Sequence, residues 1–501
     1  MPRSILCYII NLICCLCYRR EYKRFTAVTD VRAAQEQKLG DIIRHNKTCQ
    51  YAMEYDFSSI ESFRNSVPLT TYEDYLPYIK KIENGEKNVL TSDDVLLLQP
   101  TSGSVGASKF IPYTARMKAE YQCGLKPWVY QMYSTCKALK WGKSYWSITP
   151  RAQTRSCTAG GIPIGFEDDA AYFGKLHEKL LGRIFAVPSG VAREKDMDAF
   201  YFKTALALLK CRELTFVSVW NPTLFLLILD YMHDSRGALT VSLPRSRRDK
   251  VSALLEDKAY GKLWPGLQLI SCWCDANAAP YAEKLRRIFP DVIVQPKGLL
   301  ATEGFISLPF LGEEGARLSV YSHFFEFCSQ RDDNIYLAHE LECGEEYEVI
   351  ITTSGGLYRY QMNDIVRVVG FSGQIPRIKF IGKKEKVLDM FGEKLSEVFL
   401  ASLPIKSEFH MFAPEGERYV LYIKSDHALP DIDKLLSENF HYKYCRDLGQ
   451  LNQLRVFRLT GSPHKEFLEQ CVKRGQRLGD IKPTVLSLHG GWDKVFEGEY
   501  V

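Results

Sequence analysis

The sequence predicts an α/β protein with two domains, a large N-terminal α/β domain that includes a β region and a small C-terminal α+β domain. At 501 residues the chain is too long for one ordinary hydrophobic core. Helical stretches alternate with short apolar runs along much of the chain, and β-type runs dominate from Glu346 onward. The apolar fraction of 46% and the charged fraction of 25% are typical of a folded globular chain.

The charge and the cysteines narrow the class of protein. A net charge of +5 is small for this length, and no block of Lys and Arg marks a nucleic-acid surface, so we expect no nucleic-acid partner. The 15 cysteines are an odd number and are mostly scattered singly. Cys272 and Cys274 lack a second pair, so they do not have the spacing of a zinc site. Free thiols in a reducing compartment are the simplest interpretation, and we expect a cytoplasmic protein.

Residues 5–18 (ILCYIINLICCLCY) form an apolar, cysteine-rich run that Arg19 and Arg20 follow. The run is shorter than the ~20 residues of a spanning helix. Only Arg3 precedes it and no small-residue cleavage site follows, which argues against a signal peptide. Two interpretations remain, a helix within residues 1–30 that packs on the main domain, or a weak membrane-surface anchor on a cytoplasmic protein. For the anchor, the candidate acylation sites are Cys14, Cys15 and Cys17.

The next elements are predicted from apolar spacing. Residues 21–90 have helical spacing that Pro68 and Pro77 interrupt. Val95 to Leu98 fits a buried strand, and residues 114–140 fit a helix. The later segments expected as elements are two apolar helices within 198–232 divided at Asn221-Pro222, an amphipathic helix over 280–289 and a strand over 292–295.

The last part of the chain changes to β-type patterns. From Glu346 the runs EYEVIITT, LYRY, IVRVVGF and RIKFIG predict strands, with a turn at Gly355-Gly356. A basic stretch after Gly382 is typical of a solvated linker, so we place a domain boundary there. The large domain then covers residues 31–382 and the small domain residues 383–501.

The strongest local signal is the segment from Thr101 to Lys109 (TSGSVGASK), which we place between a strand and a helix. Its glycines let the backbone fold tightly, so that several N–H groups can point at one anion. Its hydroxyls add donors to phosphate oxygens, and Lys109 adds a positive charge. The glycine does not directly precede the lysine, so this is not a GxxxxGK[ST] loop. A phosphate-binding loop is favoured over a plain surface loop.

Three further segments are weaker signals when taken alone. Residues 298–304 (GLLATEG) place Thr302 beside Glu303 at the end of a strand, which suits a phosphate and Mg²⁺ together. Asp364 is expected to close a turn between two strands, where it would either accept hydrogen bonds from ribose hydroxyls or cap an Asx-type turn. Lys482 precedes a proline near the C-terminus, where a lone lysine is usually solvated.

In this order and spacing, the segments resemble the adenylate-forming superfamily. The likeness is greatest to the auxin-responsive promoter (Gretchen Hagen) family of acyl-acid amido synthetases and runs from about residue 31 to the C-terminus. Besides the four segments above, the residues that carry it are Ala34-Gln35, Pro68 to Tyr75 (PLTTYEDY), Gly85 to Leu90 (GEKNVL), Phe325-Glu326-Phe327 and Gly356 to Tyr360 (GLYRY).

The resemblance implies an ATP-dependent ligase. Such an enzyme forms an acyl-adenylate from a small carboxylic acid with ATP and Mg²⁺, and then transfers the acyl group to an amino acid or another amine. The implied fold is that of the adenylate-forming superfamily, with a large N-terminal domain and a small, mobile C-terminal domain. Lys384 and Glu385 would lie in the hinge between the two domains.

The functional positions of the family match residues of this chain one by one. The resemblance implies that Lys109 and Lys482 are the catalytic charges, with Lys482 as the mobile lysine of the small domain. Thr302 and Glu303 would meet the α-phosphate, and Glu303 would also bind Mg²⁺. The residues implied to bind ATP or AMP are Thr101, Ser102, Gly103, Ser104, Thr302, Glu303, Phe324 near the adenine and Asp364 on the ribose.

Some features depart from the family pattern. Val105 stands where plant members usually have Ser, which removes one phosphate donor. Glu393-Lys394-Leu395 replaces the usual Asp-Lys-Thr after the hinge, so the role of Lys394 stays open. The N-terminal apolar run has no counterpart, so we expect a non-plant branch. His323 is a candidate base for the amine, although a lone histidine is more commonly structural.

Several alternatives stay open at this point. The acyl acceptor could be a thiol, of coenzyme A or of a protein cysteine, in place of an amine. The chain could also be a non-catalytic acyl- or nucleotide-binding protein of the same fold, or a membrane-associated interaction protein that uses residues 5–18. We place the acyl pocket in the segment from Trp146 to Pro163, whose aromatic residues fit a hydrophobic core equally well. The sequence does not identify the acid, the amine or the oligomeric state.

Overall fold

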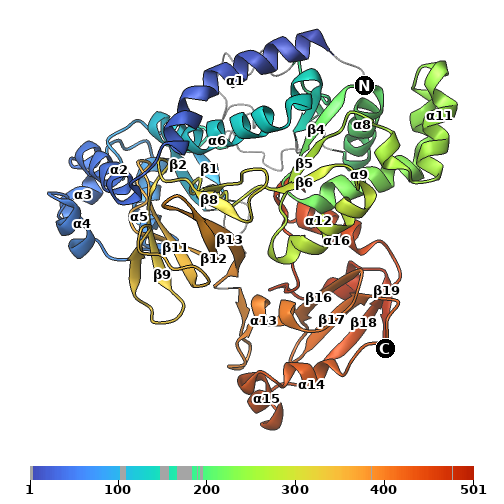
Figure 1. Ribbon diagram of the computed structural model, residues 1–501. Helices are drawn as coiled ribbons and strands as arrows, with labels where there is room; N and C mark the ends of the chain where they lie inside the picture. Colours follow the sequence, from blue (N-terminus) through green and yellow to red (C-terminus); the bar gives the residue numbers. More distant parts are fainter. Residues whose placement is uncertain are drawn as a thin grey trace. The chain divides into compact units, whose positions relative to one another are not determined.

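The computed structural model describes residues 4–101, 109–146, 157–165, 183–188, 190–191, 194, 196–384, 386–476 and 478–501. The chain divides into two compact units (Figure 1). Unit 1 comprises Met1–Asp275 and Ala279–Ile381, and unit 2 comprises Ala276–Ala278 and Gly382–Val501.

Unit 1 opens with helices, as the spacing predicts. They are α1 (Ile5–Thr26), α2 (Val31–Asn46), α3 (Gln50–Glu54), α4 (Ile60–Ser66) and α5 (Tyr72–Glu83). The side chains of Ser4 and Asp30 cap α1 and α2, and α5 begins with a capping box of Thr71 and Asp74. Pro77 lies inside α5 and does not end it. The capping box and the buried face of α5 offset the backbone hydrogen bond that proline removes.

A β-hairpin follows and carries the segment expected to bind phosphate. Strands β1 (Leu97–Pro100) and β2 (Phe110–Tyr113) pair antiparallel, with Pro100 opposite Phe110. Helix α6 (Ala115–Thr135) begins only after β2, with the Thr114 side chain as its N-cap. The segment therefore joins two strands, and our placement between a strand and a helix was wrong. The apolar residues of β2 are too few to form a recognisable run, and their buried partners lie across the hairpin.

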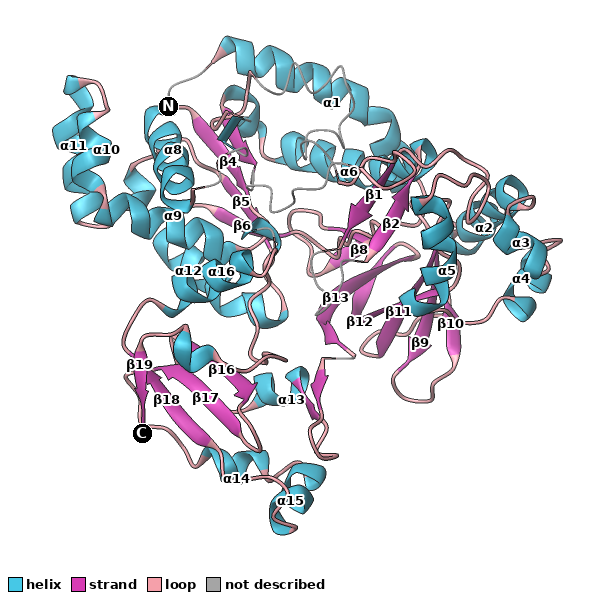
Figure 2. Cartoon of the chain, turned by 180° about the vertical axis from the view of Figure 1, so that it is seen from behind, coloured by secondary structure: helices cyan, strands magenta, loops and turns pink. Residues whose placement is uncertain are grey.

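A four-stranded parallel sheet forms the second part of unit 1. Its strands, in spatial order, are β3 (Lys143–Trp146), β4 (Leu214–Ser218), β5 (Leu269–Cys272) and β6 (Ile293–Pro296). The helices of this part are α8 (Met197–Lys210), α9 (Pro222–Asp234), α10 (Arg236–Val241), α11 (Arg245–Glu256) and α12 (Ala279–Ile288), of which α8, α9 and α12 lie beside the sheet (Figure 2). The predicted strand near 292–295 and helix near 280–289 are confirmed by β6 and α12.

Strand β4 was missed by the prediction of two consecutive apolar helices within 198–232. Every residue of β4 is buried, and it lies between β3 and β5 in the sheet. The sequence of a fully buried strand is a continuous apolar run. Apolar spacing alone does not distinguish such a run from a buried helix. The second helix, α9, begins at Pro222 with Asn221 as its N-cap, where the division was expected.

A seven-stranded sheet completes unit 1. Its order is β10-β9-β11-β12-β13-β8-β7. The strands are β7 (Ser307–Leu308), β8 (Ala316–Leu318), β9 (Phe324–Ser329), β10 (Ile335–Leu337), β11 (Glu346–Thr352), β12 (Tyr360–Ser372) and β13 (Ile375–Lys383). The β region thus starts at Ser307, well before the Glu346 that the sequence pattern suggests, because the first strands of the sheet are too short to show a period.

Unit 2 is an α+β unit around a four-stranded sheet in the order β16-β17-β18-β19. The sheet strands are β16 (Phe409–Pro414), β17 (Tyr419–Lys424), β18 (Arg455–Leu459) and β19 (Gly498–Tyr500). The other elements are β14 (Val387–Leu388), β15 (Leu395–Ser396), α13 (Glu397–Ser402), α14 (Ile432–Leu436), α15 (Phe440–Asp447), α16 (Pro463–Lys473), η6 (Leu478–Asp480) and η7 (Trp492–Lys494). The predicted fold class, α/β with a small α+β unit, is confirmed.

Candidate active site

The base of the predicted phosphate loop is fixed by the hairpin. The N–H of Thr101 donates to the carbonyl of Lys109 at 2.9 Å, so the two ends of the loop are held side by side. Thr101 and Lys109 are both half-buried. The predicted phosphate ligands Ser102, Gly103 and Ser104, and also Val105, lie outside the described residues.

Tyr72, the first residue of α5, is surrounded by groups from separate segments. Its hydroxyl accepts the N–H of Phe110 at 2.6 Å, directly beyond the loop. The ammonium of Lys109 lies 5.3 Å from the centre of its ring. Burial raises the pKa of Tyr72, and nearby carboxylates, including Glu303, raise it further. Burial and then Glu303 also raise the pKa of Tyr360. The structure therefore brings Lys109, Glu303 and the start of β12 into one region.

The turn after β6 is held in place by hydrogen bonds from tyrosine side chains to its backbone. The hydroxyl of Tyr113 donates to the carbonyl of Thr302 at 2.7 Å, and the hydroxyl of Tyr121 donates to the same carbonyl at 3.0 Å. Gly298 has a φ of +72°, and a Cβ there would lie 2.6 Å from the carbonyl oxygen of Ser307. Because tyrosines from β2 and α6 bind the carbonyl of Thr302, the turn is positioned against the hairpin that carries the loop.

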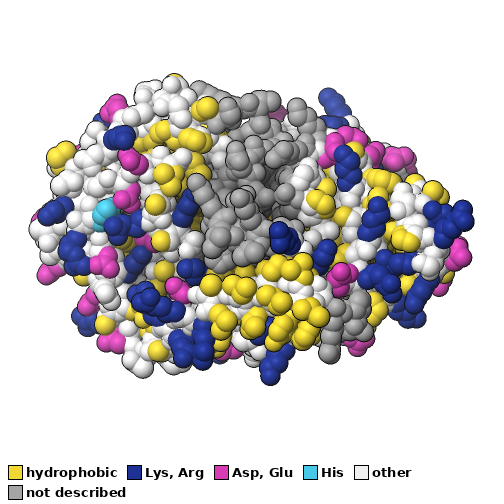
Figure 3. All heavy atoms as spheres, turned by 90° about the horizontal axis from the view of Figure 1, so that it is seen from above, with side chains coloured by type: hydrophobic (Ala, Val, Ile, Leu, Met, Phe, Trp, Pro, Cys, Tyr) yellow, Lys and Arg dark blue, Asp and Glu magenta, His cyan; other side chains and the backbone are white. Residues whose placement is uncertain are grey.

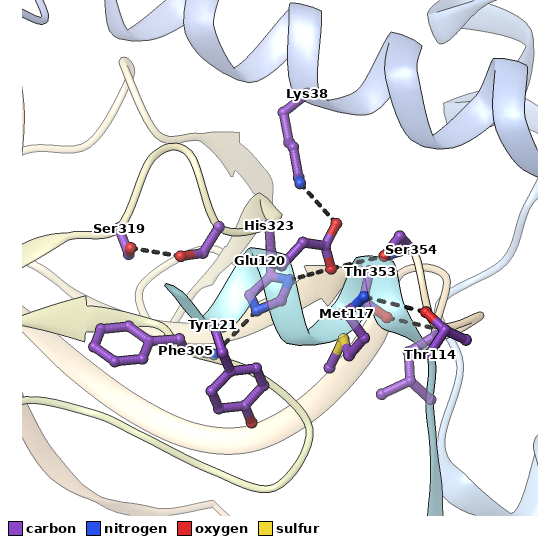
Figure 4. A network of polar contacts seen from close by, with 12 residues as sticks. Lys38, Thr114, Met117, Glu120, Tyr121, Phe305, Ser319, His323, Thr353 and Ser354 are labelled. Carbon is purple, nitrogen blue, oxygen red and sulfur yellow. Dashed lines mark hydrogen bonds and ion pairs between the residues drawn. The ribbon is translucent and has the colours of Figure 1, made fainter. Parts of the chain in front are cut away.

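A buried polar network lies beneath this turn (Figure 4). Lys38 of α2 pairs with Glu120 of α6 at 2.6 Å, and the other carboxylate oxygen of Glu120 lies 3.2 Å from Nδ1 of His323. The N–H of Phe305 donates to Nε2 of His323 at 3.0 Å, and the N–H of Ser354 donates to Glu120 at 3.3 Å. The network joins α2, α6, the residue before β9, Phe305 just after residues 298–304, and Ser354 just after β11.

Burial and neighbouring charged groups set the protonation states of Glu120 and His323 in this network. Burial by itself would raise the pKa of Glu120, but the Lys38 ammonium and the His323 ring outweigh that effect and hold the pKa at about 2. Burial lowers the pKa of His323, so its ring is neutral near pH 7. Lys38 therefore balances the charge of Glu120, and His323 acts as a neutral hydrogen-bonding group.

His323 is not placed to deprotonate an amine, contrary to the role considered for it. Its side chain is 0% exposed. Its basic nitrogen, Nε2, already accepts the N–H of Phe305, so the proton of the neutral ring is on Nδ1, toward Glu120. His323 instead supports the turn that contains Thr302 and Glu303.

The family-like residues around this site serve mainly to fix the backbone. The Gln35 amide bonds the backbone on both sides of His323. Its Nε2 donates to the carbonyl of Val320 at 2.7 Å, and its Oε1 accepts the N–H of Phe325 at 2.8 Å. Glu326 is 1% exposed and pairs with the guanidinium of Arg359 at 2.9 Å. Arg359 has a φ of +50°, and its side chain also donates to backbone carbonyls of the α4 region. These motifs hold the 354–360 turn against the N-terminal helices.

Asp364 and Phe324 lie on strands of the large sheet. Asp364 is inside β12, which begins at Tyr360, so the expectation that it closes a turn was wrong. Asn363 has a φ of +57°, and the pairing of β11 with β12 shifts nearby, which marks a bulge beside Asp364. The sequence shows no sign of this bulge, because it depends on the register with β11. Asp364 and Phe324, the first residue of β9, are each only 2% exposed.

Lys297 was not singled out from the sequence. It directly follows β6, at the carboxyl edge of the parallel sheet, and it is 2% exposed. Its ammonium donates to the hydroxyl of Ser218 at 2.7 Å and lies 5.0, 5.2 and 5.9 Å from the ring centres of Trp220, Trp128 and Trp146. Ligands of α/β sheets bind at this edge. A lysine after an apolar run is usually solvated, so the burial of Lys297 could not be anticipated.

The predicted residues of the small domain lie in unit 2. Lys482 follows η6 and is exposed, and Lys384 is also exposed, whereas Glu385 lies outside the described residues. Glu393 is 0% exposed, and its carboxylate accepts the backbone N–H groups of residues 390 and 391. The acidic residue of the Glu-Lys-Leu segment therefore holds the turn at residues 390–393. The next residue, Lys394, has a φ of +46° and is exposed to solvent.

A magnesium ion at this site would need carboxylate ligands from the described side chains. Among these residues, no group of three or more His, Cys, Asp or Glu side chains is arranged to hold a metal ion. Mg²⁺ in nucleotide sites commonly uses one or two carboxylates together with phosphate oxygens. Glu303, a half-buried carboxylate in the region of Lys109, fits that limited contribution.

Comparison with known proteins defines the class. The fold matches that of solved acyl acid amido synthetases. The solved structure of AtGH3.15 acyl acid amido synthetase in complex with 2,4-DB superimposes with a TM-score of 0.78 at 18% identity and covers 93% of both chains.

The chain belongs to the GH3 family, which confirms the resemblance found in the sequence. Residues 21–247 match the GH3 family N-terminal domain and residues 317–383 match the GH3 family central domain. It is 22% identical to indole-3-acetic acid-amido synthetase GH3.2 of Arabidopsis thaliana, over 78% of this chain and 80% of that protein. It is 24% identical to jasmonoyl–L-amino acid synthetase GH3.5 of Oryza sativa subsp. japonica, over 90% and 92%.

Glu120→Gln tests the network under the turn. The folded pKa of about 2 lies below the ordinary value of 4.5, so charged Glu120 stabilises the fold above pH 4.5. That contribution is lost as the pH falls from 4.5 toward 2. We expect Glu120→Gln to cost about 3–5 kcal/mol at pH 7, because Lys38 loses its buried partner. Thermal melting of both proteins at pH 7 and at acid pH measures the effect.

The matched control is Glu36→Gln, which removes a carboxylate from the exposed pair with Arg32. It should change stability by less than about 1 kcal/mol. Equal melting temperatures for Glu120→Gln and Glu36→Gln at pH 7 would contradict the assignment of Glu120 as a structural charge.

Proposed function

We propose that the protein is an ATP-dependent acyl-acid amido synthetase. It would adenylate a carboxylic acid and transfer the acyl group to an amino acid or another amine. The observation that carries this proposal is that Tyr113, on the hairpin that carries Lys109, is hydrogen-bonded to the turn that carries Thr302 and Glu303, in a chain of the GH3 family. The plant relatives named above are amido synthetases, which supports the same reaction class.

The first step must activate a carboxylate, which is a poor electrophile because its charge is delocalised. A carboxylate oxygen attacks the α-phosphorus of ATP, the bond to the β-phosphate oxygen breaks, and pyrophosphate leaves. Negative charge increases on the phosphate oxygens during this step. Lys109 and Lys482 would oppose that charge, and Thr302 would donate to the phosphate. A magnesium ion held through Glu303 would add positive charge there.

In the second step the amine attacks the acyl carbon, and AMP leaves with the bonding electrons. The nitrogen must lose a proton in this step. Since the basic nitrogen of His323 is occupied by a backbone N–H, His323 is not the group that accepts this proton.

The acid itself would be recognised near Lys297. Its ammonium is buried among tryptophan rings at the carboxyl edge of the parallel sheet, on the segment that leads to Thr302. A cation there suits the carboxylate of an acid before it is activated, and the rings suit an apolar or aromatic body.

The proposed function is tested by acid-dependent exchange of pyrophosphate into ATP with the full chain and a panel of acids. We expect exchange with at least one acid, and an amide product when amino acids are added. A thioester with coenzyme A and no amide would overturn the choice of acceptor. ATP binding without exchange for any acid would overturn adenylation itself.

Lys482→Ala should slow the exchange by about 10²–10³ without unfolding the protein, because Lys482 is exposed in unit 2. Lys443→Ala is the matched control, since it removes an exposed lysine of α15 from the same unit. Exchange rates in Lys482→Ala that equal those of Lys443→Ala would remove Lys482 from the mechanism.

Asp364→Asn should weaken ATP binding by about tenfold, since a charged acceptor for ribose hydroxyls is lost. Deoxy-ATP provides the internal control. If Asp364 binds the ribose, the substitution and the missing hydroxyl should not be additive. Fully additive losses, measured by calorimetry, would place Asp364 away from the ribose.

Lys297→Met should raise KM for the acid by about tenfold or more, while KM for ATP changes little, because the buried charge that would pair with the carboxylate is lost. Steady-state kinetics with each substrate varied in turn measures this. An equal rise in both KM values, or a fall in melting temperature alone, would favour a purely structural role for Lys297.

A further inference from the structure

Helix α1 is firmly attached to unit 1 through one of its faces. It lies along α6 in Figure 1 and Figure 2. The N–H of Ser4 donates to the carbonyl of Trp141 at 2.9 Å, the ring of Tyr8 stacks on Trp141 at 4.2 Å, and Asn11 donates to the carbonyl of Lys140 at 3.2 Å. The buried residues of this face are Cys7, Ile10, Asn11, Cys14, Cys15, Tyr18 and Phe25.

The opposite face of α1 presents large apolar side chains to solvent. They are Ile5, Leu6, Ile9, Ile13 and Leu16, exposed by 71, 50, 49, 44 and 59%. Their spacing of three and four residues places them in one stripe along the helix. Seen from above, hydrophobic side chains gather in one band on the side of unit 1 where α1 lies (Figure 3). We call this stripe the outer face of α1.

Basic residues continue the outer face toward the C-terminal end of α1. Arg20 follows Leu16 by four residues and Ile13 by seven, so it lies on the same side of the helix. Arg19 and Lys23 are exposed beside it. The single acidic residue of α1, Glu21, turns toward Lys126 of α6 at 3.6 Å. The face is therefore apolar over its first turns and positively charged over its last.

We propose that the outer face of α1 binds an anionic membrane surface. The apolar turns would enter the boundary between headgroups and acyl chains, and Arg19, Arg20 and Lys23 would contact lipid phosphates. In the described part of the chain, every helix is too short or too polar to cross a bilayer. The helix would lie in the plane of the interface, with its other face attached to unit 1.

The charge pattern favours this occupant over a second copy of the chain. In an antiparallel pair of outer faces, each basic end would meet the apolar turns of the partner and would find no anion there. In a parallel pair, like charges would face each other. Anionic headgroups above an apolar layer satisfy both parts of the face at once.

The cysteines of α1 are not required for this binding. Cys14 and Cys15 are buried, so they are not accessible for acylation, and only Cys17 of the three candidate sites is exposed. Binding through side chains alone is expected to be weak and reversible, and therefore sensitive to salt.

The test uses the full-length protein and flotation with phosphatidylcholine vesicles that contain or lack phosphatidylserine. We expect flotation with the anionic vesicles, and at least tenfold less with neutral vesicles or in about 1 M salt, where charges are screened within about 3 Å. Equal binding to both kinds of vesicle at low salt, or no binding to either, would overturn the proposal.

Two sets of substitutions separate the apolar and charged parts. Ile9→Gln, Ile13→Gln and Leu16→Gln together should reduce anionic-vesicle binding at least tenfold, and so should Arg19→Gln, Arg20→Gln and Lys23→Gln together. The matched control replaces three exposed apolar residues elsewhere, as Val241→Gln, Phe440→Gln and Leu448→Gln, and should bind as the unsubstituted protein does.

Melting temperatures close to that of the unsubstituted protein show that each set leaves the fold intact. Equal losses in the control set would overturn the assignment to α1. Light scattering of the unsubstituted protein distinguishes the other occupant. A dimer that the Ile9, Ile13 and Leu16 substitutions dissociate would replace the membrane with a second copy of the chain.

Discussion

The buried charge of Glu120 is a constraint that several distant segments of unit 1 must satisfy together. A carboxylate in the interior is tolerated only when its charge and hydrogen bonds are compensated, and here Lys38, a neutral His323 and the backbone at Ser354 do this together. Each partner comes from a different part of the chain. The requirement to satisfy one carboxylate thus fixes α2, α6, the turn before β9 and the end of β11 relative to one another.

The candidate active site is built on that frame through backbone contacts. Tyrosine hydroxyls from α5, β2 and α6 bind backbone groups at the ends of the hairpin loop and of the turn after β6. His323 holds the N–H of Phe305, just beyond Glu303. Because the backbone is held in this way, the side chains of Thr302, Glu303 and Lys109 are not needed to maintain the turn. They can serve a nucleotide, and rigid support of this kind suits a site that must stabilise charge as it develops.

Helix α1 shows how one apolar segment can serve two environments. The sequence run from residue 5 to 18 is apolar almost all round, and this had suggested two exclusive interpretations. The structure confirms packing on unit 1 for one face, whereas the opposite face is exposed to solvent. The matched family region begins at residue 21, so this part of the helix lies before it.

The sequence by itself determined the family, the α/β class and the elements whose signals are local. Helical spacing and the division at Asn221-Pro222 predicted α9, an amphipathic pattern predicted α12, and a short apolar run predicted β6. What required the tertiary structure was the burial of polar groups and the position of each motif within the sheets. Asp364 lies at a bulge that depends on pairing with β11. Lys297 is buried because three tryptophans from separate elements surround it. His323 has a structural role because its ring contacts Glu120 and the N–H of Phe305. Such contacts join residues far apart in the chain, so local patterns carry no record of them.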